Sequence, residues 1–64
     1  MTERQVRRYK AAFLAAFRRH GNVTWACREV GIPRGDVYRW KEHDTEFMLL
    51  YEVAEVEATE TMEQ

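Results

Sequence analysis

The sequence predicts a small all-α domain, and three observations lead to that prediction. Apolar residues recur at the three- and four-residue spacing of a helix through most of the chain. Glycines stand at positions 21 and 31 and a proline at position 33, where that spacing is interrupted. A chain of 64 residues has room for one hydrophobic core. We therefore expect a bundle of three helices followed by a longer C-terminal fourth helix.

The first expected helix ends at His20, because Gly21 can adopt the left-handed conformation that follows a helix end. At about 100° per residue, its apolar residues share one side, which we expect in the core. That side comprises Val6, Tyr9, Phe13, Ala16, Phe17 and His20. The arginines fall on the other side and should face outward, with Ala11, Leu14 and Ala15 between or beside them: Arg4, Arg7, Arg8, Arg18 and Arg19.

Two short helices should follow. Asn22 offers an N-cap side chain for the second helix, and Thr24 is the alternative. That helix should end at Val30, before Gly31. The third helix should run over about 33–41, because proline suits the first position of a helix, where its missing N–H costs nothing. Two side chains share the inner side of this helix: Val37 and Trp40.

Asp44 can cap the fourth helix, which should begin at Thr45 and contains no glycine or proline that would end it. Its apolar residues form two stripes on roughly opposite sides. The stripe expected in the core comprises Phe47, Leu50, Tyr51, Ala54, Ala58 and Met62. The second stripe comprises Leu49, Val53 and Val56. A domain of this size supplies a neighbour for only one stripe, so we expect the second to contact another copy of the chain or residues beyond this sequence.

Charge is segregated along the chain although the net charge is only −1. Residues 1–41 contain all ten basic side chains and three acids, a balance of +7, whereas residues 42–64 contain eight acids and no lysine or arginine. This asymmetry indicates a part that binds a polyanion joined to a part with another role. The alternative is two solvated faces that attract each other within one fold.

Residues 23–40 have the pattern of two helices that pack around a glycine turn. Small or apolar side chains stand at fixed offsets around Gly31: Ala26, Cys27, Val30, Ile32, Val37 and Trp40. The segment resembles the helix-turn-helix motif of DNA-binding proteins. Its Gly-Ile-Pro-Arg and Val-Tyr-Arg-Trp strings are similar to the recognition helices of transposases, recombinases and phage packaging proteins. The resemblance implies a homeodomain-like helix-turn-helix domain over residues 1–43, with its third helix in the DNA major groove.

A longer set of strings is more specific. These strings are Phe13-Leu-Ala-Ala-Phe, Gly21-Asn-Val-Thr, Val30-Gly-Ile-Pro, Val37-Tyr-Arg-Trp and Asp44-Thr-Glu-Phe. They are similar to the N-terminal DNA-binding domains of phage small terminase subunits, over the chain to about Ala54. The resemblance implies recognition of viral double-stranded DNA for packaging, a homo-oligomer and contact with the large terminase subunit, an ATPase and nuclease. Residues 44–64 would form an acidic helix that packs on the domain and leads to an oligomerisation region.

The candidate DNA contacts lie mainly on the third helix. Arg34 is in its first turn, which usually enters the groove deepest, so we expect it to contact a base, with Tyr38 as a further groove contact. Gly35 would let the helix backbone approach a partner closely. Arg39 and Lys41 are expected to bind phosphates.

Three other residues complete the candidate surface. Arg28 should add positive charge from the second helix, and Trp25 should lie at the DNA-facing edge of that helix. Asp36 either complements the start of the third helix as a capping group or accepts a hydrogen bond from a cytosine amino group.

Other classes of function are not favoured. No nucleophilic triad, phosphate-binding glycine loop or pair of catalytic carboxylates can be assembled, so we expect no enzyme, cofactor or metal. The longest apolar run, Ala11 to Phe17, is too short to span a membrane, as is Phe47 to Tyr51, so we expect a cytoplasmic protein, in the host cell if it is viral. Two alternatives stay open: a transcription regulator or transposase-like protein with the same motif, and an assembly module that does not bind DNA.

Overall fold

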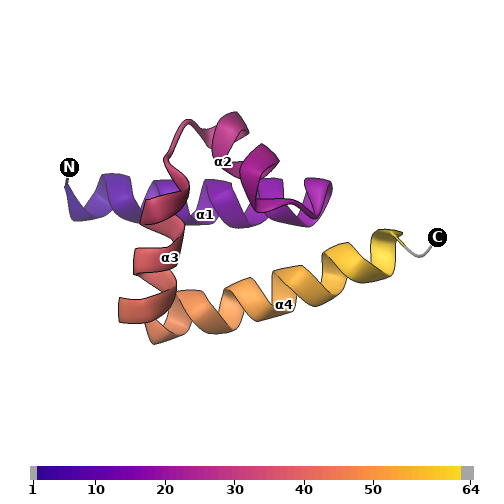
Figure 1. Cartoon of the computed structure of the whole chain (residues 1–64). Helices are drawn as coiled ribbons and strands as arrows, with labels where there is room; N and C mark the ends of the chain where they lie inside the picture. Colours follow the sequence, from indigo (N-terminus) through magenta and orange to yellow (C-terminus); the bar gives the residue numbers. More distant parts are fainter. Residues whose placement is uncertain (1, 63–64) are drawn as a thin grey trace.

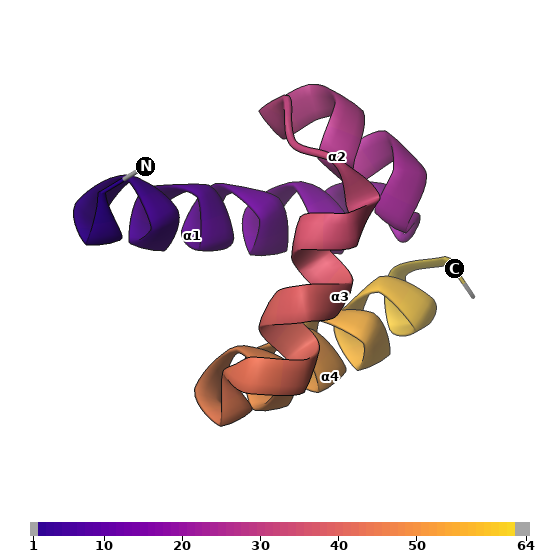
Figure 2. The same cartoon turned by 60° about the vertical axis from the view of Figure 1, so that its left-hand side comes forward.

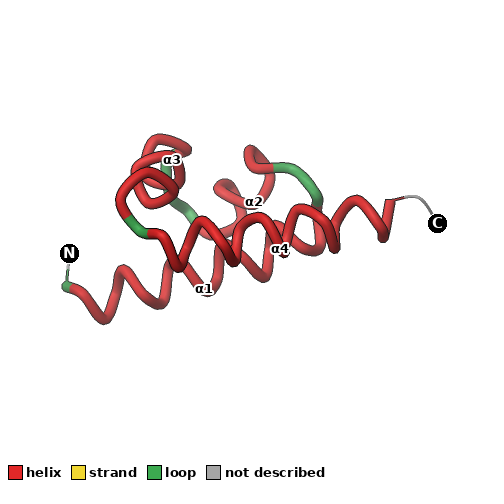
Figure 3. Tube along the Cα trace, turned by 90° about the horizontal axis from the view of Figure 1, so that it is seen from below, coloured by secondary structure: helices red, strands yellow, loops and turns green. Residues whose placement is uncertain are grey.

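The computed structural model describes residues 2–62, with side chains described to residue 58, and it contains four helices and no strand within that range. They are α1 (Glu3–His20), α2 (Val23–Val30), α3 (Arg34–His43) and α4 (Thr45–Met62) (Figure 1). The two long helices, α1 and α4, lie side by side and run in the same direction (Figures 1 and 3). Helix α2 packs on α1, and α3 crosses steeply to reach the start of α4 (Figure 2). The all-α prediction is confirmed.

Local signals set most of the helix ends. The N-terminus of α1 carries a capping box, in which Thr2 Oγ1 accepts from the Gln5 N–H at 3.2 Å and Gln5 Oε1 accepts from the Thr2 N–H at 3.1 Å. Gly21 ends this helix with φ +64°, as expected. Asn22 is the N-cap of α2, because its Oδ1 accepts from the Trp25 N–H at 3.1 Å. Gly31 ends α2 with φ +85°.

Helix α3 differs from the expected range at both ends. Pro33 is its N-cap and not its first helical residue, and it offers no side-chain hydrogen bond to the helix. Its extended backbone, with ψ 150°, lies outside the helical region. At the other end α3 continues past Lys41 to His43, because the turn comes only at Asp44, whose N–H donates to the Trp40 carbonyl at 2.7 Å. Asp44 Oδ1 then accepts from the Phe47 N–H at 3.1 Å and caps α4, as expected.

An aromatic cluster forms the centre of the core. Phe13 and Phe47 are fully or almost fully buried, with ring centroids 6.0 Å apart, and the Tyr51 ring lies 4.8 Å from that of Phe17. Trp40 closes one side of the cluster, edge-on to Phe47 at 5.5 Å. The other buried core side chains are Leu14, Ala16, Ala26, Cys27, Ile32, Val37, Ala54 and Ala58. All four helices therefore contribute to one core.

Some expected core positions were wrong. His20 is exposed, because it lies in the last turn of α1, where its Nε2 atom is 3.5 Å from the Glu29 carboxylate at the surface. Leu50 remains 39% exposed at the rim of a groove between α1 and the start of α4. Leu14 is buried, since α2 and α4 both pack on α1 and cover a wider arc than one stripe. Val6 is only half-buried. The expected inward position of Met62 falls outside the described side chains.

Candidate nucleic-acid interface

Helix α3 presents one side to the core and the other to solvent. Val37 is fully buried, and Trp40 is half-buried against Phe47, so these two side chains hold the helix in place as expected. The predicted contact residues lie on the remaining surface. Arg34, Gly35, Tyr38 and Arg39 are all exposed, and the side chain of Tyr38 is 53% exposed. Of the five residues of α3 expected to contact DNA, all except Lys41 therefore lie together on its exposed surface.

The first turn of α3 lies close to the buried Cys27 of α2. Burial raises the pKa of the Cys27 thiol, while the positive charge of Arg34 opposes this rise and the negative charge of Asp36 adds to it. Cys27 is thus an uncharged, buried side chain that lets the two helices approach. Asp36 lies in the first turn of α3, where a negative charge complements the helix dipole. It makes no side-chain cap of the kind that Asn22 and Asp44 make.

Gly35 leaves the backbone of α3 uncovered. A Cβ atom placed there would have no neighbour within 4 Å, so packing inside the domain does not require glycine at this position. Its φ is not positive, so backbone conformation does not require glycine either. Neither packing nor backbone conformation therefore explains the glycine, and its structural effect is to leave the surface of the α3 backbone open at this position.

Lys41 lies apart from the exposed face of α3. Its Nζ atom is 4.1 Å from the centroid of the Tyr51 ring, and the side chain is partly buried between α3 and α4. Burial of Tyr51 raises the pKa of its hydroxyl, with a further contribution from the Glu55 carboxylate, so the ring beneath Lys41 stays neutral. The ammonium group is held against α4, which is a different arrangement from the phosphate contact expected from the sequence.

Trp25 and Arg28 form an exposed pair on α2. The Arg28 guanidinium carbon lies 5.4 Å from the centroid of the Trp25 ring, and the Trp25 side chain is 56% exposed. Residues three apart on a helix are neighbours, so the sequence already contained the signal for this pairing. An indole stacked with a guanidinium offers a flat, positively charged surface.

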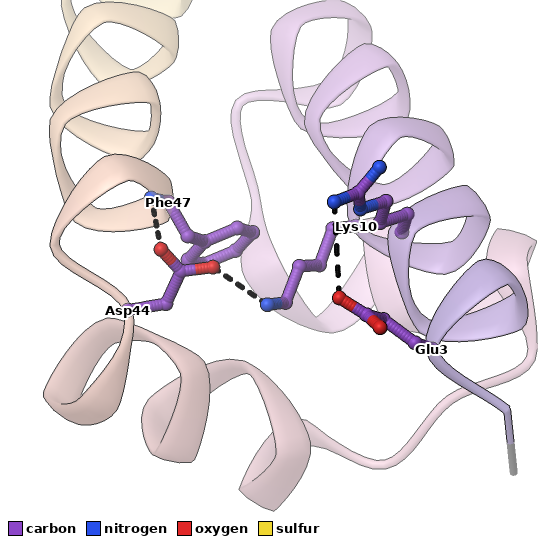
Figure 4. Close-up of polar contacts among 5 residues, drawn as sticks. Glu3, Lys10, Asp44 and Phe47 are labelled. Carbon is purple, nitrogen blue, oxygen red and sulfur yellow. Dashed lines mark hydrogen bonds and ion pairs between the residues drawn. The ribbon is translucent and has the colours of Figure 1, made fainter.

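Ion pairs connect the basic α1 to the acids of other helices. Lys10 reaches from α1 to Asp44, with Nζ and Oδ2 2.6 Å apart, while the other Asp44 oxygen caps α4 (Figure 4). Arg18 pairs with Glu57 at 3.0 Å and Arg19 with Glu29 at 2.5 Å. The opposite charges of the two halves thus attract each other within the fold for part of the basic set, as the alternative interpretation of the charge pattern predicted.

Other cations are not engaged in this way. Among the side chains described, residues 2–58, Arg4, Arg8, Arg34 and Arg39 make no ion pair. Sequence composition cannot distinguish the cations that form ion pairs from those that do not, because pairing depends on which helices pack together. Arginines without an acidic partner, such as those of α3, are available to neutralise the charge of a polyanion.

A groove of about 570 Å³ runs between the first half of α1 and the start of α4. Its lining includes the apolar side chains of Val6, Leu14 and Phe47, together with charged side chains of both signs. None of the candidate contact residues lines it, so it is separate from the exposed face of α3.

No protein-family model, curated protein or solved structure matches the chain significantly. Within the described part of the chain, no helix is long and apolar enough to cross a membrane. The same part contains no group of three histidine, cysteine or acidic side chains that could hold a metal ion.

Proposed function

We propose that the chain is a DNA-binding module that places α3 in the major groove. One observation carries the proposal: Arg34 and Arg39 are exposed and unpaired beside Tyr38 and Gly35, on the side of α3 that faces away from the core. The major groove is about 12 Å wide and admits a helix. The planar guanidinium of Arg34 would hold the O6 and N7 atoms of a guanine, while Arg39 would neutralise phosphate.

The α2 pair extends this surface in the proposal. Arg28 would contact the DNA backbone, and Trp25 would pack against sugar and phosphate. Lys41 would contribute only if its ammonium left the Tyr51 ring, so we assign it a structural role in joining α3 to α4. The open backbone at Gly35 supports a close approach of α3 to the DNA.

The biological system follows from the resemblance to phage small terminase subunits. In that system the module would recognise viral genomic DNA in the host cytoplasm and deliver it to the large terminase subunit. A transcription regulator or transposase-like helix-turn-helix protein would use the same chemistry. Neither use requires catalysis by this chain.

Binding to a labelled mixed-sequence duplex tests the proposal. We expect fluorescence anisotropy to show an affinity that falls steeply as salt rises, because phosphate contacts release counterions. Replacing both Arg34 and Arg39 by alanine should weaken binding. The Arg34 substitution alone should cost about 1–3 kcal/mol, which is the usual strength of a bidentate hydrogen bond to a base. Helicity should not change, since both side chains are exposed.

The control is Arg7→Ala, since Arg7 is also an exposed arginine, and it pairs with Glu3 at 3.7 Å. It should weaken binding much less than either α3 substitution. Equal affinity of the wild type and the Arg34→Ala/Arg39→Ala variant at low salt would contradict the assignment of α3 as the recognition helix.

A second candidate function rests on a different observation. Leu49, Val53 and Val56 of α4 are about half exposed, and they form the second apolar stripe expected from the sequence. Such a stripe is typical of a protein interface. We propose that the chain self-associates through it, either in addition to binding DNA or as a pure assembly module.

A further inference from the structure

The exposed apolar stripe of α4 has a regular helical spacing. Leu49, Val53 and Val56 are separated by four and three residues, and their side chains are 57%, 49% and 57% exposed. They lie on the opposite side of α4 from the buried Phe47 and Tyr51. Spacings of four and three are those of helices that pack along their length at a small crossing angle, about 20°. The stripe therefore fits another helix.

The surroundings of the stripe are acidic. Glu46 lies one turn before Leu49 on the same side, and Glu52 lies beside Val53. No lysine or arginine occurs anywhere in α4. Two α4 helices packed stripe to stripe would therefore bring acids together without a cation between them, which is destabilising. The partner helix should instead have a small or apolar centre and positively charged ends.

The outward face of α1 has those properties. Its residues follow the same alternation of four and three: Arg4, Arg8, Ala11, Ala15 and Arg18. All five are exposed. The two alanines leave the middle of the face shallow, and arginines stand at both ends. Arg18 pairs with Glu57 of its own chain, whereas Arg4 and Arg8 have no acidic partner among the described side chains, residues 2–58.

We infer that the α4 stripe of one copy packs on the outward face of α1 in a second copy. The larger side chains of Leu49, Val53 and Val56 would fill the space above Ala11 and Ala15. Both helices are 18 residues long, which is about 27 Å, so the faces match in length. The free arginines of one copy would then meet the acids of the other, near Glu46 and Glu52.

One copy does not make this contact with itself. Helices α1 and α4 already pack against each other through their buried sides, and the side chains of Leu49, Val53, Ala11 and Ala15 all stay exposed. Each copy would contact one neighbour through its α4 stripe and another neighbour through the outward face of its α1. Such a heterologous contact generates a closed ring or an open chain, whereas a symmetric dimer uses the same surface twice. This inference rests on the self-association proposed above and specifies which surfaces meet.

Two variants with complementary defects test it. The first is Leu49→Glu/Val53→Glu, which disables the α4 stripe and leaves α1 intact. The second is Ala11→Glu/Ala15→Glu, which disables the outward face of α1 and leaves α4 intact. All four positions are exposed, so circular dichroism should show wild-type helicity for both variants. Met48→Glu and Ala12→Glu are single-acid controls, because each position is exposed and lies at the flank of the proposed contact and not among the residues that make it.

Sedimentation velocity supplies the decisive masses. We expect the wild type and the two controls to form species larger than a monomer, and each double variant to be monomeric. An equimolar mixture of the two double variants should form a dimer and nothing larger, because one intact α1 face meets one intact α4 stripe.

Three results would overturn parts of this scheme, and they are distinguishable. If the Ala11→Glu/Ala15→Glu variant keeps the wild-type mass, α1 is not the partner surface, although self-association stands. If the mixture stays monomeric, the two faces do not meet. If the wild type is monomeric at every concentration, the proposed self-association itself fails. DNA binding by the same proteins is measured separately and does not depend on the outcome.

Discussion

Gly31 and Gly35 lie four residues apart, and their backbone conformations decide what an alanine would do at each. Gly31 has φ +85°, in the left-handed region that favours glycine, and it ends α2. Gly35 has no positive φ and lies in the first turn of α3. A Cβ atom would meet no neighbour within 4 Å at either position. The two positions therefore differ in the backbone strain that an alanine would cause, and not in the space available for its side chain.

We predict opposite effects of alanine on stability at these positions. Gly35→Ala should raise the free energy of unfolding by about 0.5–1 kcal/mol, because alanine restricts the unfolded chain and suits a helix. Gly31→Ala should lower it by about 1–2 kcal/mol, because alanine is strained at positive φ. Urea unfolding measures both. Gly35→Ala should also weaken DNA binding if α3 approaches the DNA closely; unchanged affinity would place Gly35 outside the contact.

Single residues also show what the sequence could not predict. Arg39 and Lys41 received the same expected role, since both are cations near the end of one helix. The structure separates them, because Lys41 turns toward the Tyr51 ring and Arg39 stays exposed. That difference depends on how α3 meets α4, and nothing in the local sequence encodes it. The Trp25–Arg28 pair, by contrast, was not assigned from the sequence, although the spacing of three residues would have allowed it.

At the scale of elements, the helix ends that a capping side chain or a glycine determines could be predicted from the sequence. Gly21, Asn22, Gly31 and Asp44 act through their own backbone or side chain, and each ends or begins a helix where expected. The start of α3 was misplaced, because proline is accepted both as N-cap and as first helical residue, and the local sequence does not distinguish them. The second α4 stripe was also predicted, since helical periodicity fixes it.

Asp44 joins three elements, and we predict that its charge makes stability depend on pH. The hydrogen bond from Lys10, followed by that from the Phe47 N–H, holds the pKa of Asp44 below its ordinary value. A lowered pKa in the folded state contributes stability that is present above the unfolded pKa, about 4, and is lost as the pH falls through the lower folded value. The free energy of unfolding should therefore decrease as the medium is acidified below about pH 4.

Urea titrations at a series of pH values check this prediction. Asp44→Asn should be less stable than the wild type at neutral pH, and its stability should decline less on acidification. Lys10→Met is the second variant, because it removes the hydrogen bond that lowers the Asp44 pKa most and keeps much of the aliphatic stem near Trp40. Identical acid dependence in the wild type and Asp44→Asn would exclude Asp44 as the titrating group.

At the scale of the whole molecule, the composition of the core was easier to predict than its assembly. The aromatic residues of α1 and α4 were expected inside, and they form the central cluster. The ion pairs of Lys10 and Arg18 were not assigned, because a charge pattern does not reveal which helices lie side by side. For the same reason Leu50 was placed inside although it lies at the rim of a groove.

Phe47 should be the most sensitive position of the fold. Its ring contacts those of Phe13, Trp40 and Tyr51, which come from three helices. Phe47→Ala should cost about 3–5 kcal/mol, and a chain of 64 residues has a total stability of about 3–10 kcal/mol. Thermal unfolding followed by circular dichroism should show a large loss of structure at 25 °C or a strongly lowered Tm. Leu50→Ala on the same helix should cost far less; equal effects would mean that the aromatic cluster is not the centre of stability.

The parallel arrangement of α1 and α4 gives the domain a polarity that its net charge conceals. Exposed arginines lie on α1, α2 and α3, whereas the exposed acids of α4 flank its apolar stripe, so an almost neutral molecule carries its charges unevenly and is an electric dipole. A dipole feels a torque in the field of a polyanion before it makes any contact, and it approaches with its cationic side first. The acidic side then faces away from the polyanion and repels approach in the reverse orientation. Charge segregation along the sequence thus becomes orientation in space.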